Sequence, residues 1–141
     1  MSMSGRPPHA GLRHLALSVH DFDAMKRFYV ELLGFAVEWE PDADNVYLSS
    51  GIDNLALHRS TPPAVRAAAS DSSSRGALDH LGLIVRTAED VDRWAAFLER
   101  EGVTLDARPR THRDGARSCY FRDPDGNHIQ IIHHPPISGK V

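Results

Sequence analysis

The stretch Asp79-His80-Leu81-Gly82-Leu83-Ile84-Val85 decides the fold, because it repeats the earlier stretch Arg13-His14-Leu15-Ala16-Leu17-Ser18-Val19. From the histidine onward, four of the six positions are identical. Alternate side chains of an extended strand share a face, so each histidine lies beside a very small residue while the leucines and the valine lie opposite. Each stretch is therefore predicted to be a strand with one apolar face for burial under a helix and one open face that carries a histidine.

A helix and three strands are predicted after the first of these stretches. Asp21 is placed to cap a helix and Gly34 to end it, and apolar residues recur between them at helical spacing. Short runs separated by turn-forming residues then predict strands at residues 35–40, 45–49 and 54–59.

The second half of the chain runs through the same order of elements. Thr87 is placed to cap a helix, Asp90 to answer it three residues on, and Gly102 to end it. Leu98 belongs to the predicted buried stripe of this helix, with Val91 and either Trp94 or Ala95. Strands are predicted at 103–107, 117–121 and 127–132, with a tight turn at Asp123-Pro124-Asp125-Gly126 whose aspartates are structural.

The predicted organisation is two modules joined by a long connection. Residues 60–77 are rich in proline, alanine and serine, which is typical of a linker, with one helical turn expected near residues 65–69. The full division is a flexible N-terminal tail at 1–11, a first βαβββ module at 12–59, a linker loop at 60–77, a second βαβββ module at 78–134 and a C-terminal tail at 135–141.

Composition narrows the class of protein. The chain has 141 residues, of which 41% are hydrophobic and 25% charged, as in ordinary globular proteins. A net charge of -3 gives no electrostatic case for a nucleic-acid partner, and no apolar run is long enough to span a membrane or to form a signal peptide. Cys119 is the only cysteine, so an intrachain disulfide is impossible and a cytoplasmic location is expected.

The duplicated unit carries a family resemblance. A histidine on each first strand, a helix that ends near Leu32-Leu33-Gly34-Phe35, and a closing Phe121-x-Asp-Pro-Asp-Gly-Asn-x-Ile-x-Ile resemble the vicinal oxygen chelate superfamily over residues 12–134. That superfamily includes glyoxalases, extradiol dioxygenases, methylmalonyl-CoA epimerase, and the fosfomycin and bleomycin resistance proteins. The resemblance implies an α+β fold in which two βαβββ modules form an open, cup-shaped mixed sheet with helices on the outer face. It also implies a homodimer.

The resemblance also implies metal ligands on the first and last strand of each module. His14 and His80 match the histidine positions, and the first strands are expected to pair so that both imidazoles reach one ion. Ala56 and Gln130 stand where carboxylates are usual, so the implied ligands are His14, His80 and Gln130. His58 lies on the face of Ala56 and is a further candidate. The implied cofactor is a divalent ion such as Fe, Mn, Ni or Zn, and a protein without metal remains the alternative.

Several other side chains are candidates for contact with a small-molecule substrate. Trp39 and Tyr47 are expected to form walls of the cup. Arg117 and Tyr120 are candidate contacts for an oxyanionic substrate, although Arg117 can equally be a solvated strand residue. His128 shares the face of Gln130 by alternation and is expected near the rim.

Two functions remain open from the sequence. The first is a metal-dependent lyase, isomerase or dioxygenase of the glyoxalase type, acting on a small molecule with vicinal oxygens. The second is a metal-free protein that binds and sequesters a small molecule, as in bleomycin resistance. Cys119 is expected to pack rather than react, because no basic partner that would lower its pKa is evident.

Overall fold

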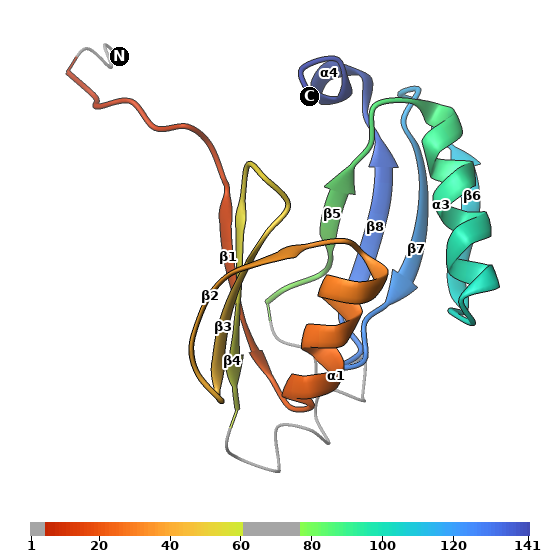
Figure 1. Cartoon of the computed structure of the whole chain (residues 1–141). Coiled ribbons are helices and arrows are strands. Elements are labelled where there is room, and N and C mark those ends of the chain that lie inside the picture. The colour runs from red at the N-terminus through yellow and green to blue at the C-terminus, as the bar shows by residue number, and fades with distance from the viewer. Residues whose placement is uncertain (1–4, 61–76) are drawn as a thin grey trace. The chain divides into compact units, whose positions relative to one another are not determined.

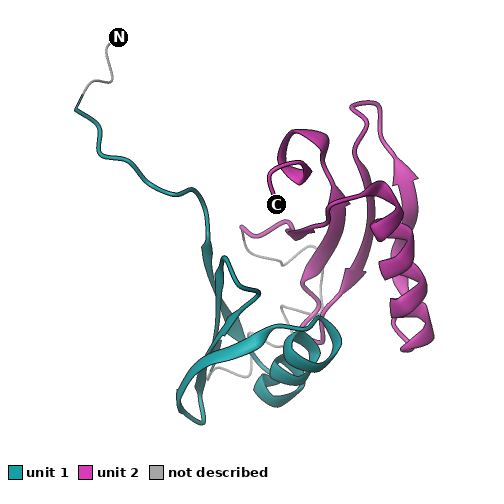
Figure 2. Cartoon of the chain, turned by 45° about the horizontal axis from the view of Figure 1, so that its top comes forward, with its two compact units in different colours: residues 1–61 teal, residues 62–141 magenta. Residues whose placement is uncertain are grey.

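The computed structural model describes residues 5–60 and 77–141 and has an α+β fold (Figure 1). The chain divides into two compact units, residues 1–61 and 62–141 (Figure 2). Each unit has the predicted βαβββ order and an open four-stranded mixed sheet, which confirms the predicted fold class. The predicted linker lies outside the described residues except at its two ends, as do residues 1–4 of the predicted N-terminal tail.

The first unit contains one sheet with the strand order β1-β4-β3-β2. β1 runs parallel to β4, and the other neighbours are antiparallel. The elements of the unit are β1 (His14–Val19), α1 (Phe22–Arg27), the π-helical turn η1 (Phe28–Leu32), β2 (Ala36–Asp42), β3 (Asn45–Ser49) and β4 (Asn54–Arg59).

The second unit repeats this topology with the strand order β5-β8-β7-β6. β5 runs parallel to β8, as β1 does to β4, so the first and last strands of each unit are neighbours. The prediction that the two first strands pair with each other is wrong, because β1 and β5 belong to separate sheets and each pairs with the last strand of its own unit. The elements of the unit are β5 (Leu81–Ile84), α3 (Ala88–Arg100), β6 (Leu105–Thr111), β7 (Arg117–Arg122), β8 (His128–His133) and α4 (Pro135–Ser138).

Burial follows the alternation read from the repeated stretches. In β1, Leu17 and Val19 are buried while His14, Ala16 and Ser18 are exposed. In β5, the leucines are half-buried and Gly82 is exposed. One face of each sheet therefore packs into the core and the other stays open. The core is formed by large side chains that are fully buried: Tyr29, Met25, Val19, Val46, Leu48, Leu57, Val91, Leu98, Cys119, Phe121, Ile129 and Ile131.

The caps of the helices are those predicted. The Asp21 carboxylate accepts a hydrogen bond from the backbone N–H of Ala24 (3.1 Å) at the start of α1. Thr87 and Asp90 form a reciprocal capping box at the start of α3. Gly34 and Gly102 follow their helices with φ near +82° and +83°, a conformation that glycine adopts without strain.

The first helix is shorter than predicted. α1 ends at Arg27, and the chain continues as the wider turn η1, in which the backbone N–H of Leu33 bonds the carbonyl of Phe28 (3.1 Å). The extra residue per turn lets both Tyr29 and Leu33 enter the core. The apolar residues before Gly34 also fit α-helical spacing, so the sequence pattern did not reveal this change.

The second strand of each unit is longer than predicted. The prediction placed the end of β2 at residue 40 and of β6 at residue 107, but they reach Asp42 and Thr111. β2 contains Pro41 and β6 contains Pro109, and both are edge strands, where a missing N–H need not cost a ladder hydrogen bond.

Each edge strand also carries a β-bulge at an acidic residue. In β2, Val37 pairs with Leu48 and Trp39 with Tyr47, so Glu38 is the extra residue. In β6, Leu105 pairs with Phe121 and Ala107 with Tyr120, so Asp106 is extra. The bulge re-aims the acidic side chain, and its repetition places a carboxylate at the same point of each sheet.

Two features complete the second unit. Residues 123–126 form the predicted tight turn, in which the backbone N–H of Gly126 bonds the carbonyl of Asp123 (2.9 Å). The segment predicted as a C-terminal tail contains the short helix α4, where the Ser138 hydroxyl is buried and accepts from the backbone N–H of His134 (2.9 Å). None of the described helices is both long and apolar enough to cross a membrane.

Candidate functional site

The open face of the second sheet places Gln130 at its centre. Gln130 pairs with Gly82 on β5 and with Tyr120 on β7, so all three residues share one face. A Cβ atom at Gly82 would lie 3.7 Å from the Gln130 Oε1 atom, which locates the amide oxygen directly beside the glycine. The small residue therefore leaves the space in front of the amide free.

Gln130 is a nearly buried amide that lacks a hydrogen-bond partner. Its side chain is 8% exposed, yet no hydrogen bond to it occurs within residues 5–60 and 77–141. Among the described residues, the fully buried side-chain nitrogen or oxygen without a partner is His133 Nδ1, so the Gln130 amide atoms are not sealed from solvent. The Gln130 amide is therefore available to a ligand.

His80 lies one residue before β5 begins and shares the face of Gly82 by alternation. Its Nδ1 atom donates to the Asp79 carboxylate (2.6 Å), which leaves Nε2 with a free lone pair. The imidazole contacts the Tyr120 ring edge-on, with ring centroids 5.5 Å apart. The Tyr120 ring therefore lies between His80 and a second histidine, which belongs to β8.

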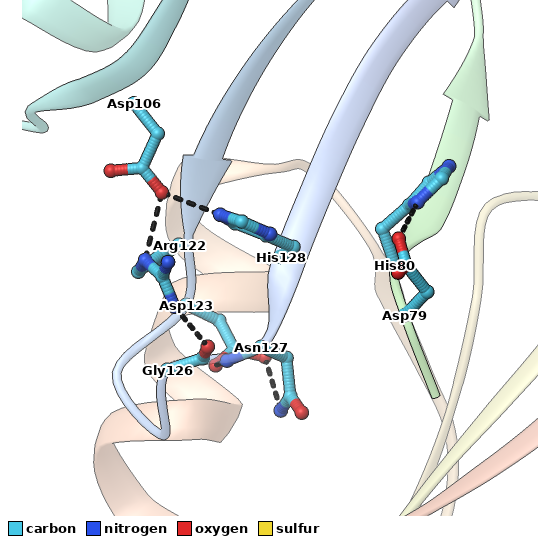
Figure 3. Close-up of polar contacts among 8 residues, drawn as sticks. All are labelled: Asp79, His80, Asp106, Arg122, Asp123, Gly126, Asn127 and His128. Atoms are coloured by element: carbon cyan, nitrogen blue, oxygen red, sulfur yellow. Dashed lines mark hydrogen bonds and ion pairs between the residues drawn. The ribbon is translucent and has the colours of Figure 1, made fainter. Parts of the chain in front are cut away.

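That histidine is His128, at the start of β8. Its Nε2 atom donates to Asp106 Oδ2 (2.7 Å), and the same oxygen accepts from Arg122 Nε (2.7 Å), as Figure 3 shows. The Tyr120 and His128 rings lie 6.0 Å apart. The Asp106 carboxylate therefore fixes the orientation of the His128 ring through its Nε2 atom.

The surroundings of Tyr120 raise the pKa of its hydroxyl. Burial is the largest cause, and the nearby negative charge of Asp79 adds to it. Arg110 acts in the opposite direction and lowers the pKa, which shows that its guanidinium lies within electrostatic reach. Tyr120 therefore stays protonated at neutral pH and can donate a hydrogen bond.

The open face of the first sheet has a related arrangement around His14. The His14 Nδ1 atom donates to Asn54 Oδ1 (2.7 Å), so its Nε2 atom is also free. The Asn54 amide donates in turn to the bulged Glu38 (3.4 Å). Ala16 of β1 and Ala56 of β4 pair beside these hydrogen bonds, and neither side chain has an atom that could bind a metal or donate a hydrogen bond.

The aromatic candidates gather on the same sheet. The rings of Trp39 and Tyr47 stack with centroids 5.1 Å apart and an interplanar angle of 25°, and Trp39 is 58% exposed. His58 lies edge-on to Tyr47 (5.7 Å), and its Nδ1 atom donates to Asn45 Oδ1 (2.6 Å). β4 continues regularly through His58, as its candidacy required.

Arg117 does not lie with the other candidates. It pairs with Thr111 on the helix-covered face of β7, opposite Tyr120. Its guanidinium forms two hydrogen bonds with Asp92 of α3 (2.7 and 3.0 Å), which lower the pKa of that carboxyl. Arg117 is thus engaged in fixing α3 to the sheet, and we leave it out of the candidate site.

Cys119 is fully buried on that same face, and burial raises the pKa of its thiol to about 11. A thiol with this pKa carries almost no thiolate at neutral pH, and the thiolate is the reactive form. Cys119 therefore packs in the core as expected.

Sequence reasoning missed the partners that orient these imidazoles. Asp106 and Glu38 belong to edge strands, where nothing in the alternation marks them as functional. The sequence does contain a signal for them. Glu38 lies four residues after Gly34, and Asp106 lies four residues after Gly102, so the two acids occupy the same position in the two halves. Aligning the two halves beyond their first strands would have found the pair.

The candidate donors can be tested against the needs of a divalent ion. Ligating histidines usually donate their second ring nitrogen to a carboxylate or amide oxygen, which fixes the tautomer. His14 and His80 both do so and both present Nε2. Gln130 can offer a neutral amide oxygen as a ligand, whereas the Ala56 side chain has no ligand atom. Among the described residues, no group of three or more His, Cys, Asp and Glu side chains is arranged to hold a metal. Within its own unit, each imidazole therefore presents one ring nitrogen to a ligand, and Gln130 presents an amide oxygen.

Comparison with known proteins identifies the family. Residues 11–131 match the Glyoxalase/Bleomycin resistance protein/Dioxygenase superfamily, and the chain belongs to it. The match covers nearly the whole of both units and agrees with the duplicated topology.

Individual relatives add the fold but no specific activity. The uncharacterized protein YraH of Bacillus subtilis is 29% identical over 122 residues, which cover 85% of this chain and 95% of that protein. The structure of a lactoylglutathione lyase from Agrobacterium tumefaciens is similar with a TM-score of 0.72 at 21% identity, over 90% of this chain and 96% of that one. The structure of a glyoxalase family protein from Enterococcus faecalis gives a TM-score of 0.69 at 28% identity, over 88% and 98%.

Proposed function

We propose that the protein is a metal-dependent enzyme of the glyoxalase and dioxygenase type that acts on a small molecule with vicinal oxygens. His14, His80 and Gln130 would hold the divalent ion, and His58 is a further candidate ligand. The observation that carries the proposal is the Gln130 amide, which is 8% exposed and lacks a hydrogen-bond partner among the described residues. An amide oxygen binds a divalent ion, although more weakly than a carboxylate does.

The oriented imidazoles support the proposal. His14 and His80 each use Nδ1 for an oxygen of their own unit and keep Nε2 for a ligand. A bound divalent ion would supply Lewis acidity towards the substrate oxygens. The chain's own residues would do the rest: Tyr120 would donate a hydrogen bond to the substrate, and His128, fixed by Asp106, would accept a proton at Nδ1.

Calorimetric titration of Mn(II), Ni(II) or Fe(II) into chelator-treated protein tests the metal site. We expect His80→Ala and His14→Ala to lose binding, because each removes an imidazole ligand. Gln130→Glu should bind more tightly, because it keeps the reach of the side chain and supplies a charged oxygen. His128→Ala is the matched control and should bind metal like the wild type. Equal, weak binding by all of these variants would contradict the proposal.

A second function is favoured by a different observation. The stacked pair of Trp39 and Tyr47 exposes a flat aromatic surface, with Trp39 58% exposed. Such a surface suits a metal-free protein that binds and sequesters a partly aromatic small molecule. The metal content of protein purified without added metal distinguishes the two functions. A stoichiometric amount of metal would support the enzyme. No metal in the purified protein, together with a metal affinity that Gln130→Glu does not change, would support sequestration.

Two further properties remain proposals. We propose a homodimer, which rests on the family resemblance, and light scattering that finds only monomer at micromolar concentration would contradict it. We also propose a cytoplasmic location, since the single cysteine, Cys119, is a free and buried thiol.

A further inference from the structure

A cavity of about 560 Å³ lies at the hairpin that joins β6 and β7. Its lining is strongly basic, because two arginines and a histidine contribute to it. The residues that line the cavity are Arg110, Thr111, His112, Arg113 and Asp114. The pocket is open to solvent, because Arg110, Thr111, Arg113 and Asp114 are exposed, so an anion can enter it directly.

The two arginines of this cavity differ from most others in the second unit. Arg93, Arg108, Arg117 and Arg122 each form an ion pair with a carboxylate. Arg110 and Arg113 form none within the part of the chain that the structure describes. The two guanidinium groups therefore carry a charge that no carboxylate neutralises, and Arg110 uses only one donor, towards His112.

The other lining groups prepare the cavity for an anion. Arg110 donates to His112 Nδ1 (3.4 Å), so the opposite ring nitrogen, Nε2, carries the proton and donates to the buried Ser118 hydroxyl (3.1 Å). These two hydrogen bonds hold the Arg110 side chain in place, so that binding of an anion costs little further side-chain entropy. The carboxylate of Asp114 lines the cavity too, but it accepts from the backbone N–H of Ala116 (3.0 Å) and leaves a positive balance.

The cavity lies on the same sheet face as the candidate site. Arg110 pairs with Ser118, and Ser118 shares its face with Tyr120 two residues along β7. Two strand residues span about 7 Å, so one small molecule can reach both places. The effect of Arg110 on the pKa of Tyr120 agrees with this proximity.

We propose that Arg110 and Arg113, supported by His112, form an oxyanion-binding site that takes the carboxylate or phosphate group of the substrate. Arginine suits this role, because its planar guanidinium binds such groups through two parallel hydrogen bonds. The identification of the anion as part of the substrate rests on the proposed function, whereas anion binding itself does not. The substrate class is then a small molecule that carries a carboxylate or phosphate group in addition to its vicinal oxygens.

Titration of inorganic phosphate, and separately of malonate, into the full chain tests the site. Binding is followed by backbone amide shifts at residues 110–116 in a low-chloride buffer. We expect saturable shifts, and at least about tenfold weaker binding for Arg110→Ala and for Arg113→Ala, because each loses a charge-assisted hydrogen-bond pair. Arg110→Lys keeps the charge and should bind with intermediate affinity. The relative affinities for phosphate and malonate identify the anion type.

Two control variants separate a built site from diffuse positive charge. Arg108→Ala and Arg93→Ala remove the same charge from paired arginines elsewhere in the unit and should bind phosphate within about twofold of the wild type. The proposal is overturned if neither anion shifts residues 110–116 at tens of millimolar, or if the control variants lose as much affinity as Arg110→Ala. Titration of metal into the same variants tests the two proposals separately. Metal binding without anion binding would contradict only the proposed anion site. Anion binding without metal binding would contradict only the proposed metal site.

Discussion

Replacing Asp123 by alanine should destabilise the protein strongly without touching the candidate site. The carboxylate is 4% exposed and accepts three hydrogen bonds that close the turn between β7 and β8. Oδ1 accepts from the backbone N–H groups of Asp125 (3.0 Å) and Asn127 (2.9 Å), and Oδ2 accepts from the Asn127 amide (2.9 Å). The variant leaves all three donors without this acceptor.

The expected loss follows from those contacts. Each buried donor left unpaired costs about 1–2 kcal/mol, so the three together cost about 3–5 kcal/mol. This is a large share of the ~5–15 kcal/mol by which a domain is stable. For a chain of this size about 1 kcal/mol lowers Tm by about 3–4 °C, so Tm should fall by about 10–20 °C.

Thermal unfolding followed by circular dichroism measures the effect against two graded variants. Asp123→Asn keeps an oxygen that can accept from both backbone N–H groups and should lose less than half as much. Asp114→Ala removes a single hydrogen bond, to the backbone N–H of Ala116, from an exposed turn and should cost about 1 kcal/mol or less. Below its Tm, Asp123→Ala should bind metal normally. A Tm within 2 °C of the wild type, or a selective loss of metal affinity, would refute the structural role of Asp123.

Three further outcomes follow from burial and spacing. Leu98→Asp should unfold or aggregate the protein, because Leu98 is fully buried and an unpaired buried carboxylate costs several kcal/mol; a normal melting curve would contradict this. Cys119 should react with a thiol reagent at pH 8 at least about 100-fold more slowly than an unperturbed thiol, since its pKa rises from 9.0 to about 11; fast labelling of native protein would refute its burial. Gly82→Ala should be tolerated, because its Cβ meets ordinary contacts at 3.6–3.9 Å, whereas Gly82→Val should cover the Gln130 amide and weaken metal binding; equal metal affinity of both variants would contradict the position of Gln130.

The repeated stretch determined much of the architecture by itself. Alternation in the strands, helical spacing and the capping residues are local properties, so Asp21, Thr87 and Gly102 predicted the helix ends correctly. The histidine at the same point of both halves gave the family, because a duplicated pattern is far less accidental than a single one. The ends of β2 and β6 were harder to predict, because a proline is compatible both with a turn and with an edge strand.

Tertiary structure alone decided which polar side chains meet. His128 joins Asp106 across 22 positions of sequence, and His14 joins Asn54 across 40, because strand pairing and not sequence distance sets these contacts. The β-bulges bring Glu38 to Asn54 and Asp106 to His128, and strand alternation has no signature for an inserted residue. Register also placed Arg110 on the face of Tyr120 and Arg117 on the opposite face. A one-residue difference in pairing exchanges those faces, and only the folded sheet fixes it.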